Sequence, residues 1–199
     1  MRTFIAIELP AKIRRKVKEV QDQMQSVGWE IPNSKVRNPP SIKWVREENI
    51  HLTLKFLGEL IEEQVQKVIR GVEETVETSV PFSISLESIG AFPSWKRANV
   101  IWVGVERGKE EVTRLQRGIE ESLMKLQFKK EENPFSPHIT IGRVKRGARI
   151  FDPTNLEFST EPFLMKEISV MKSTLTPSGP IYDRLRAIPL GIQGIIVER

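Results

Sequence analysis

The chain has 199 residues, of which 39% are hydrophobic and 29% are charged, and its formal net charge is +5 at pH 7. These proportions are typical of a globular protein, and the length suffices for one domain or two small lobes with a buried core. Cysteine is absent, which excludes disulfide bonds, thiolate nucleophiles and zinc fingers. No apolar run approaches the roughly 20 residues of a transmembrane helix. The positive charge suits a polyanionic partner but is also compatible with an ordinary Lys/Glu-rich surface.

The chain begins with a predicted strand and a predicted helix. Residues 3–9 (TFIAIEL) favour a strand, and this apolar stretch is too short for a signal sequence, so we expect a cytoplasmic protein. Residues 11–26 predict a helix whose apolar stripe consists of Ile13, Val17, Val20 and Met24. The proline-containing stretch 28–43 predicts a loop that is mobile or borders a site.

Strands and helices alternate in the rest of the chain. The predicted elements are strands at 42–45 and 51–57, a helix at 62–77, strands at 82–92 and 99–106, a helix at 110–126, a strand at 138–144, a polar segment at 145–162, an apolar segment at 163–174 and a last strand near 181–190. Most strands show period-two alternation rather than continuous apolar runs, which favours antiparallel or mixed sheets. The sequence therefore predicts an α+β fold.

Both histidines of the chain begin the same four-residue pattern, His-apolar-Thr-apolar. The pattern is HLTL from His51 and HITI from His138. Strand alternation places each histidine on the same face as the threonine two residues later, Thr53 or Thr140. The apolar residues, including Phe56, are expected on the buried face. Each motif strand follows a strand and a helix, which suggests two pseudo-symmetric lobes whose polar pairs face each other across a cleft.

The paired motifs suit acid–base chemistry on a phosphate. Two facing imidazoles can supply a base and an acid in one turnover, because the unperturbed pKa of histidine lies near neutral pH. One activates water and the other protonates the leaving oxygen. The threonine hydroxyls can donate hydrogen bonds to phosphate oxygens and stabilise the charge of the transition state. Such a site suits a phosphodiester with a built-in leaving group, above all a 2′,3′-cyclic phosphate.

Arg143 is a candidate third phosphate ligand, because its planar guanidinium matches phosphate oxygens. Strict alternation would place Arg143 on the face opposite His138, so this role requires a bulge at Gly142, the end of the strand or a side chain that curls back. The alternatives are a surface arginine and, for either motif alone, a structural histidine at a strand start. A metal site would need a third ligand, which neither motif provides at ligand spacing.

The motifs and their contexts resemble the two-histidine (2H) phosphoesterase superfamily and, within it, the RNA 2′,3′-cyclic phosphodiesterases, also called 2′-5′ RNA ligases. The likeness extends along most of the chain and includes RTFIAIELP, KWVREENIHLTLKFLG, IGAFPSWKRANVIWVGV, FSPHITIGRV and SGPIYDRL. The resemblance implies one bilobal domain over residues 1–199, with mainly antiparallel sheets, flanking helices and an active-site cleft between the lobes.

The resemblance also implies residue roles. His51 would be the proton donor and His138 the proton acceptor, and these roles would exchange if ligation ran in reverse. The side chains expected to bind the phosphate are Thr53, Thr140 and Arg143. Three aromatic residues are expected near the nucleotide, although each is also a plausible core residue: Phe92, Trp44 and Tyr182. No metal or cofactor is expected.

The activity implied by the resemblance is metal-independent hydrolysis of a terminal RNA 2′,3′-cyclic phosphate to a 2′-phosphate, with ATP-independent reversible 2′-5′ ligation as a related reaction. The expected partner is RNA with such an end, for example a tRNA half, and the expected state is a monomer without membrane contact. Two alternatives stay open. The site could act on ADP-ribose cyclic phosphate or 2′-5′ oligoadenylate, or the chain could be a non-catalytic RNA-binding module.

Overall fold

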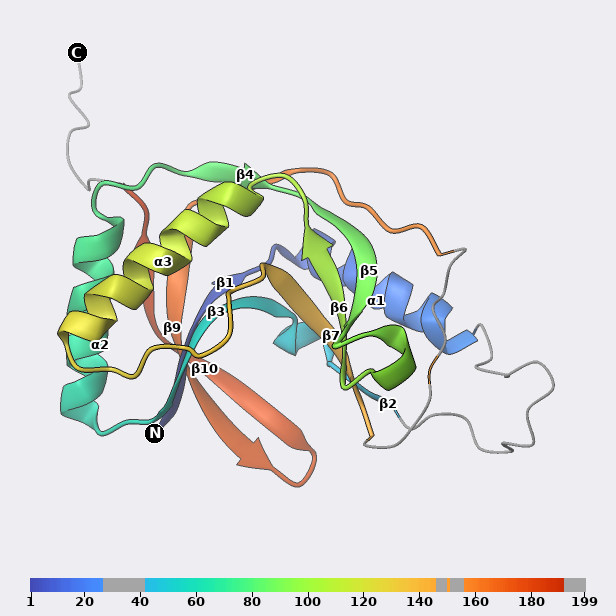
Figure 1. Cartoon of the computed structure of the whole chain (residues 1–199), viewed down its shortest axis with the longest axis horizontal. Coiled ribbons are helices and arrows are strands. Elements are labelled where there is room, and N and C mark those ends of the chain that lie inside the picture. Colours follow the sequence, from blue (N-terminus) through green and yellow to red (C-terminus); the bar gives the residue numbers. More distant parts are fainter. Residues whose placement is uncertain (27–41, 146–149, 151–155, 192–199) are drawn as a thin grey trace, which may run out of the picture.

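The computed structural model of the chain describes residues 1–26, 42–145, 150 and 156–191. The helices are α1 (Ala11–Ser26), α2 (Glu62–Val76) and α3 (Lys109–Lys125), with short 3-10 helices at Glu47–Asn49 and Trp95–Arg97 (Figure 1). The strands are β1 (Arg2–Glu8), β2 (Ile42–Trp44), β3 (His51–Glu59), β4 (Phe82–Ile84), β5 (Leu86–Phe92), β6 (Val100–Val105), β7 (His138–Val144), β8 (Phe163–Met165), β9 (Glu167–Thr176) and β10 (Gly179–Pro189).

Eight strands form one antiparallel sheet in the order β10-β9-β1-β3-β7-β6-β5, and β2 pairs with β7. Its two halves meet at β3 and β7, which share a single residue pair, Leu52 with Ile139. The three inner strands on each side correspond, because β1 and β9 lie beyond β3 as β6 and β5 lie beyond β7, while β10 extends one half and β2 pairs with β7 in the other. This arrangement confirms the predicted α+β fold with two pseudo-symmetric lobes.

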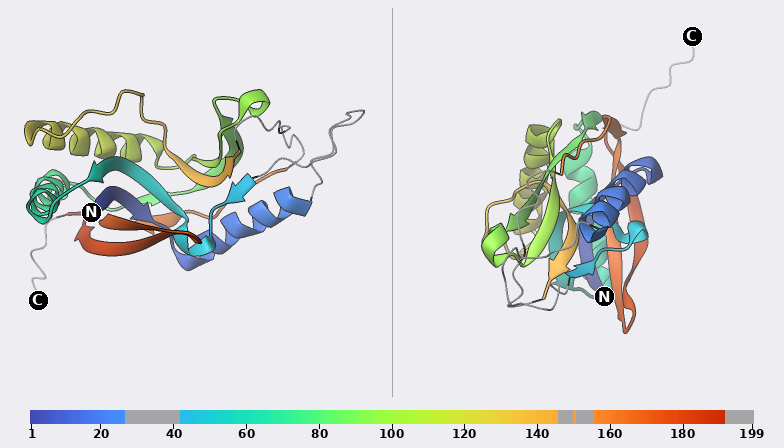
Figure 2. Two further views of the ribbon diagram at one scale, coloured as in Figure 1. Left: turned by 90° about the horizontal axis from the view of Figure 1, so that it is seen from below. Right: turned by 90° about the vertical axis from the view of Figure 1, so that its right-hand side faces the viewer.

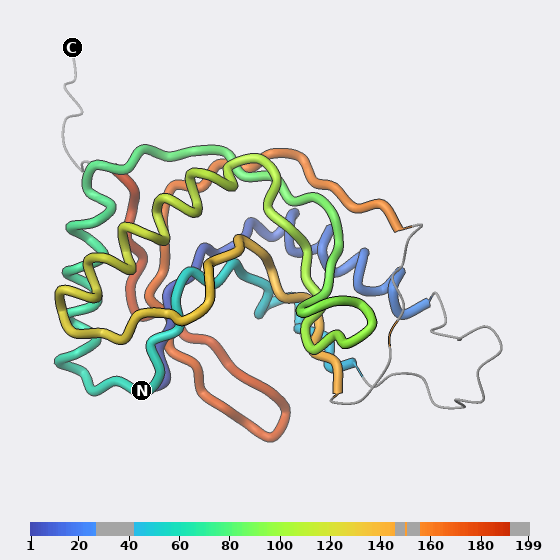
Figure 3. Tube along the Cα trace, viewed as in Figure 1, coloured from blue at the N-terminus to red at the C-terminus, as the bar shows by residue number. Residues whose placement is uncertain are grey.

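Each lobe combines strands from both halves of the chain. After β3 the chain forms α2 and then β5, which pairs with β6 of the other lobe. After β7 it returns to form β9, which pairs with β1. In Figure 3 the blue β1 and the orange β9 therefore run side by side, although they come from opposite ends of the sequence. Figure 2 shows α2 and α3 at one end of the molecule and α1 toward the other.

The helices bury the faces that their periodicity predicts. The expected stripe of α1, from Ile13 to Met24, is buried, and one polar residue, Gln21, is buried with it. The helix α2 buries the expected valine and isoleucine face, and α3 buries most of its expected face. Burial of these apolar stripes against the sheet is the main force that holds the helices in place. Within the described residues, no helix is long and apolar enough to cross a membrane.

Two predicted segments divide in the structure. The strand predicted at 82–92 is wrong as a single element, because β4 pairs with β8 in a separate two-stranded sheet while β5 pairs with β6. The chain changes partner at Ser85, whose backbone pairs with Glu106 and Arg107 instead. The apolar segment 163–174 divides in the same way into β8 and β9. Most of the predicted loop at 28–43 and part of the polar segment at 145–162 lie outside the described residues.

Candidate active site

The two motif histidines line one cavity of about 910 Å³ where the two halves of the sheet meet. His51 is the first residue of β3 and His138 is the first residue of β7, so the junction of these two strands brings both imidazoles to the same place. The three side chains predicted to bind phosphate line the same cavity: Thr53, Thr140 and Arg143. The fold therefore gathers all five polar residues of the predicted site.

Each imidazole is oriented by the backbone carbonyl two residues before it. Nδ1 of His51 lies 2.7 Å from the carbonyl oxygen of Asn49, and Nδ1 of His138 lies 2.7 Å from that of Ser136. A carbonyl oxygen can only accept, so in both rings Nδ1 carries a proton and Nε2 is the nitrogen that exchanges one. Nε2 of His51 accepts a hydrogen bond from the Thr53 hydroxyl at 3.0 Å.

Both motif strands contain a β-bulge at the fourth residue of the motif. In β3 the extra residue in the pairing with β1 is Leu54. In β7 the extra residue in the pairing with β6 is Ile141. A bulge shifts the alternation of side chains by one residue, so the residues that follow change faces. Arg143 consequently shares the cavity face with His138, and the difficulty that strict alternation raised for this arginine is resolved.

The bulge in β3 has the same effect on Phe56, which makes the expectation of a buried side chain wrong. Phe56 is 57% exposed and lines the cavity, whereas Lys55 occupies the buried face and forms an ion pair with Glu120 at 2.8 Å. Phe56 stands five residues after His51, as Arg143 stands five residues after His138. This matching position is the one signal in the sequence that could have pointed to Phe56.

Of the three aromatic residues predicted near the nucleotide, Trp44 and Tyr182 line the cavity. The Tyr182 ring is also almost perpendicular to the His51 ring, with centroids 5.3 Å apart. Phe92 instead packs against His138, again almost perpendicular and with centroids 5.0 Å apart. Such edge-to-face contacts restrict the orientation of each imidazole.

Both histidines are held in the neutral state more strongly than a histidine in water. Burial lowers the pKa of His51 below its ordinary value of 6.5; the Asn49 carbonyl and Glu8 oppose this shift, and Arg143 adds to it. Burial likewise lowers the pKa of His138, with Arg143 adding to the shift and the Ser136 carbonyl opposing it. Burial acts in this direction because it disfavours the charged imidazolium.

A carboxylate distinguishes the two histidines. Glu8 of β1 is the cross-strand neighbour of His51, whereas the corresponding neighbour of His138 in β6 is Gly104, which has no side chain. The Glu8 carboxylate accepts hydrogen bonds from Arg184, at 2.7 Å, and from Ser169. Burial raises the pKa of Glu8, but these partners outweigh burial and hold the pKa below its ordinary value. Glu8 is therefore ionised at neutral pH and favours the protonated form of His51.

Among the described residues, no group of three or more His, Cys, Asp or Glu side chains is placed to hold a metal ion. The polar groups that line the cavity include the two imidazoles, the two threonine hydroxyls and the Arg143 guanidinium, which suit a phosphate anion. This donor set can hold a phosphodiester and exchange protons with it.

The sequence model described as LigT-like phosphoesterase matches residues 18–102 and again residues 103–182, so each match contains one motif. A protein of Archaeoglobus fulgidus named RNA 2′,3′-cyclic phosphodiesterase is 36% identical, with 94% of this chain and 98% of the relative covered. A protein of Methanocaldococcus jannaschii with the same name is 35% identical, with 94% and 99% covered. The crystal structure of TT0787 of Thermus thermophilus has a TM-score of 0.79 and 26% identity, with 98% and 100% covered. The chain belongs to the LigT-like phosphoesterase family.

Proposed function

We propose that the protein is a metal-independent phosphodiesterase that opens the 2′,3′-cyclic phosphate at the end of an RNA and leaves a 2′-phosphate. The observation that carries this proposal is the pair of imidazoles of His51 and His138, which line one cavity together with two hydroxyls and a guanidinium. The name shared by relatives that match almost the whole chain supports the choice of substrate.

In the proposed reaction one phosphorus–oxygen bond forms and another breaks. Neutral His138 takes a proton from water through Nε2, and the water oxygen attacks phosphorus. Protonated His51 gives its Nε2 proton to the ribose 3′ oxygen as the bond between that oxygen and phosphorus breaks. The product carries a 2′-phosphate and a 3′-hydroxyl, and exchange with solvent restores the protonation states of the two imidazoles.

The direction of proton transfer rests on Glu8. A general acid must be protonated at the start of the turnover, and the carboxylate beside His51 favours that state. His138 has glycine at the corresponding position and is better suited to act as the base. If the 5′-hydroxyl of a second RNA replaced water, the same groups would form a 2′-5′ linkage without ATP, and the reverse reaction would exchange the histidine roles.

The phosphate ligands in this proposal are the two threonines and Arg143. The Thr53 hydroxyl donates to Nε2 of His51 while the ring is neutral. Once Nε2 is protonated it no longer accepts a hydrogen bond, so the hydroxyl is free to donate to a phosphate oxygen. Thr140 holds the equivalent place in the other motif, and the guanidinium of Arg143 neutralises the charge that builds up on the phosphate.

We assign the terminal nucleoside to the aromatic wall of the cavity, formed by Trp44, Phe56 and Tyr182. Aromatic side chains bind bases by stacking without requiring a particular sequence. Phe92 would act indirectly, through its contact with the His138 ring. A monomer suffices for the reaction because one chain supplies both histidines. We propose a cytoplasmic location, where a tRNA half is one candidate substrate.

The test is incubation of the purified protein with an oligonucleotide that ends in a 2′,3′-cyclic phosphate, in the presence of EDTA, followed by identification of the product isomer. The expected product is the 2′-phosphate, formed at the same rate with and without the chelator. Formation of the 3′-phosphate, or loss of activity with EDTA that added metal restores, would contradict the proposal.

The same assay separates the alternative substrates. A preference for longer oligonucleotides in kcat/KM is expected if the substrate is RNA. A higher kcat/KM for ADP-ribose cyclic phosphate or 2′-5′ oligoadenylate would instead identify a small molecule as the substrate. A non-catalytic RNA-binding module would retain RNA without forming any product.

A further inference from the structure

A glutamine occupies a core position of helix α1. Gln21 is fully buried and lies in the same stripe as Val17, Val20 and Met24. An apolar residue would fill this position without removing a polar group from water, whereas a buried amide is destabilising unless it forms hydrogen bonds. The contacts of the Gln21 side chain should therefore explain its presence.

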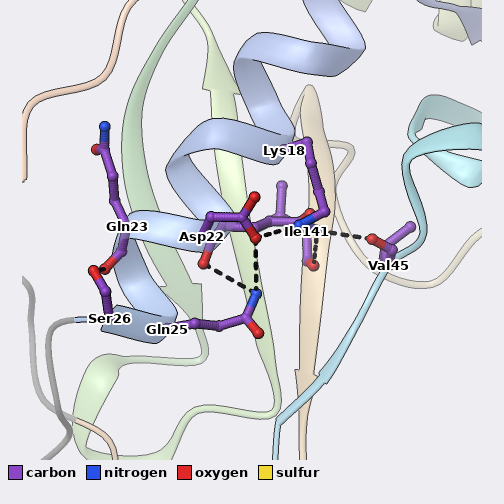
Figure 4. Close-up of polar contacts among 8 residues, drawn as sticks. Lys18, Asp22, Gln23, Gln25, Ser26, Val45 and Ile141 are labelled. Carbon is purple, nitrogen blue, oxygen red and sulfur yellow. Dashed lines mark hydrogen bonds and ion pairs between the residues drawn. The ribbon is translucent and has the colours of Figure 1, made fainter.

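The Gln21 amide bonds to two strands at the point where they separate. Its Nε2 donates to the carbonyl oxygen of Ile141 at 2.7 Å and to that of Val45 at 2.9 Å. The Val45 N–H also donates to the Ile141 carbonyl, at 3.0 Å. Figure 4 shows Ile141 and Val45 facing the helix. The amide oxygen has no partner within the described residues, so the side chain acts as a donor only.

Ile141 is the bulge residue of β7, and its carbonyl lies in a gap of the sheet. On this side β7 pairs with β3 only at Ile139 and with β2 from Gly142 onward. A bulge leaves a residue out of the regular ladder with β6, and on the opposite side the Val45 N–H is the backbone donor to the Ile141 carbonyl. Gln21 supplies a second donor to this carbonyl from outside the sheet and ties it to the Val45 carbonyl.

The position of Arg143 depends on this bulge, because the bulge places the arginine on the cavity face. We propose that Gln21 is a positioning residue: its amide holds the bulge at Ile141 and the adjoining Val45, and thereby the two cavity residues Arg143 and Trp44. This inference rests on the proposed function only for the assignment of Arg143 as a phosphate ligand. Gln21 touches no substrate in this arrangement.

The test uses Gln21→Met, which keeps an unbranched side chain of similar length in the apolar stripe but removes the donor. The variant should fold with an unchanged or higher Tm. Its kcat/KM on the cyclic-phosphate oligonucleotide should fall by about 10- to 100-fold, because small displacements of a ligand for the reacting group have effects of this size. The dissociation constant for inorganic phosphate should rise in the same way as in Arg143→Ala.

Gln25→Met is the matched control. It makes the same chemical change one turn later on α1, where the side chain is exposed and its hydrogen bonds within the described residues go to its own helix (Figure 4). This variant should keep the activity and the phosphate affinity of the wild type.

The double variant Gln21→Met, Arg143→Ala identifies the route of the effect. If Gln21 acts through Arg143, its loss should change the activity and phosphate affinity of the Arg143→Ala protein by less than about threefold, because coupled residues are not additive. A fully additive loss, or wild-type activity and phosphate affinity in Gln21→Met, would overturn the inference.

If Gln21→Met does not fold, Gln21→Asn takes its place with the same expectations, because its amide is too short to reach both carbonyls. Absence of activity in the wild type would contradict the proposed function, while the phosphate affinities would still test Gln21.

Discussion

His51 and His138 owe their orientation to interactions within a few residues of each ring. In both cases Nδ1 bonds to the carbonyl two residues earlier, and an aromatic ring lies perpendicular to the imidazole. The two sites differ in charge, because the Glu8 carboxylate lies beside His51 and Gly104 holds the corresponding place beside His138. A pair of similar groups with one added charge is sufficient to separate an acid from a base.

Replacement of either histidine by alanine should lower kcat on the cyclic-phosphate oligonucleotide by about 10²- to 10⁴-fold, the usual contribution of general acid–base catalysis. The kcat of the double variant His51→Ala, His138→Ala should be at most slightly lower than that of either single variant, because the two groups act in one step. Single-turnover kinetics measures the effect, with circular dichroism to confirm folding. Undiminished hydrolysis by the double variant would contradict the assignment.

The pH profile of kcat/KM should be bell-shaped, and the midpoint of each limb reports the pKa of one histidine. Both midpoints should lie below the ordinary histidine pKa of 6.5, because burial lowers the pKa of His51 and of His138. The rate rises as His138 loses its proton and falls as His51 loses its proton. Glu8→Gln removes the charge that raises the pKa of His51, while the opposing Arg143 is unchanged. The descending limb should therefore move to lower pH. A movement to higher pH would contradict the role of Glu8.

Phe56→Ala should raise KM for the RNA substrate by about 5- to 150-fold, since loss of one stacking ring usually costs about 1–3 kcal/mol. The side chain is 57% exposed, so Tm should change little. Leu164→Ala, which truncates a side chain that is 59% exposed outside the cavity, is the control. An oligonucleotide with an abasic cyclic-phosphate end should be hydrolysed equally by the variant and the wild type; equal sensitivity of both substrates would contradict stacking.

At the scale of the elements, the strands β5 and β6 support the second histidine. Gly90 of β5 lies opposite Trp102 of β6, whose ring also contacts Phe92 and His138. A Cβ atom at Gly90 would lie 2.1 Å from the Trp102 ring, which is too close for any packed contact. The glycine therefore permits the indole to lie flat across the strand beside the imidazole.

Gly90→Ala should displace Trp102 and destabilise the protein by about 1–3 kcal/mol, the usual cost of overpacking. It should also lower kcat, because the indole is part of the aromatic packing around His138. Urea unfolding and steady-state kinetics measure the two effects. Unchanged stability together with unchanged kcat would show that the indole has no supporting role.

For the molecule as a whole, two buried polar contacts connect the first half of the chain to the second. Gln21 of α1 bonds to β7, and Lys55 of β3 forms an ion pair with Glu120 of α3. The side chains of this pair are 2% and 9% exposed, and Lys55 also donates to the carbonyl of Lys129 in the segment that leads toward His138. Both contacts therefore link the two halves of the chain through residues in or close to the motif strands.

Lys55→Met should lower the free energy of unfolding by about 3–5 kcal/mol, because it leaves the Glu120 carboxylate buried without its cation. The double variant Lys55→Met, Glu120→Leu should recover most of this loss, since an apolar pair of similar volume avoids the cost of burying charge. Urea unfolding of the three proteins measures the difference. If the double variant were as unstable as Lys55→Met, the loss would come from the missing ion pair itself and not from a Glu120 carboxylate buried without its cation.

Much of the architecture follows from short-range patterns. The order of helices and strands, the buried stripes of the helices and the antiparallel character of the sheets were all predictable, because periodicity reports which face of an element is apolar. The division of residues 82–92 was not, because β4 and β5 differ only in the strands that they pair with. The two histidines and threonines were also predictable as a set, because two copies of one pattern are informative where a single copy is not.

The sequence by itself determined that two strands each carry a histidine and a threonine on one face, and that the chain resembles a phosphoesterase. Only the tertiary structure decided which residues share the cavity with them. Bulges at Leu54 and Ile141 reverse the alternation of each strand, so Arg143 and Phe56 face the cavity and Lys55 is buried. A bulge arises when one strand offers an extra residue to its partner, and the partners β1 and β6 come from elsewhere in the chain. Its position therefore depends on non-local pairing, which the alternation within a single strand does not record.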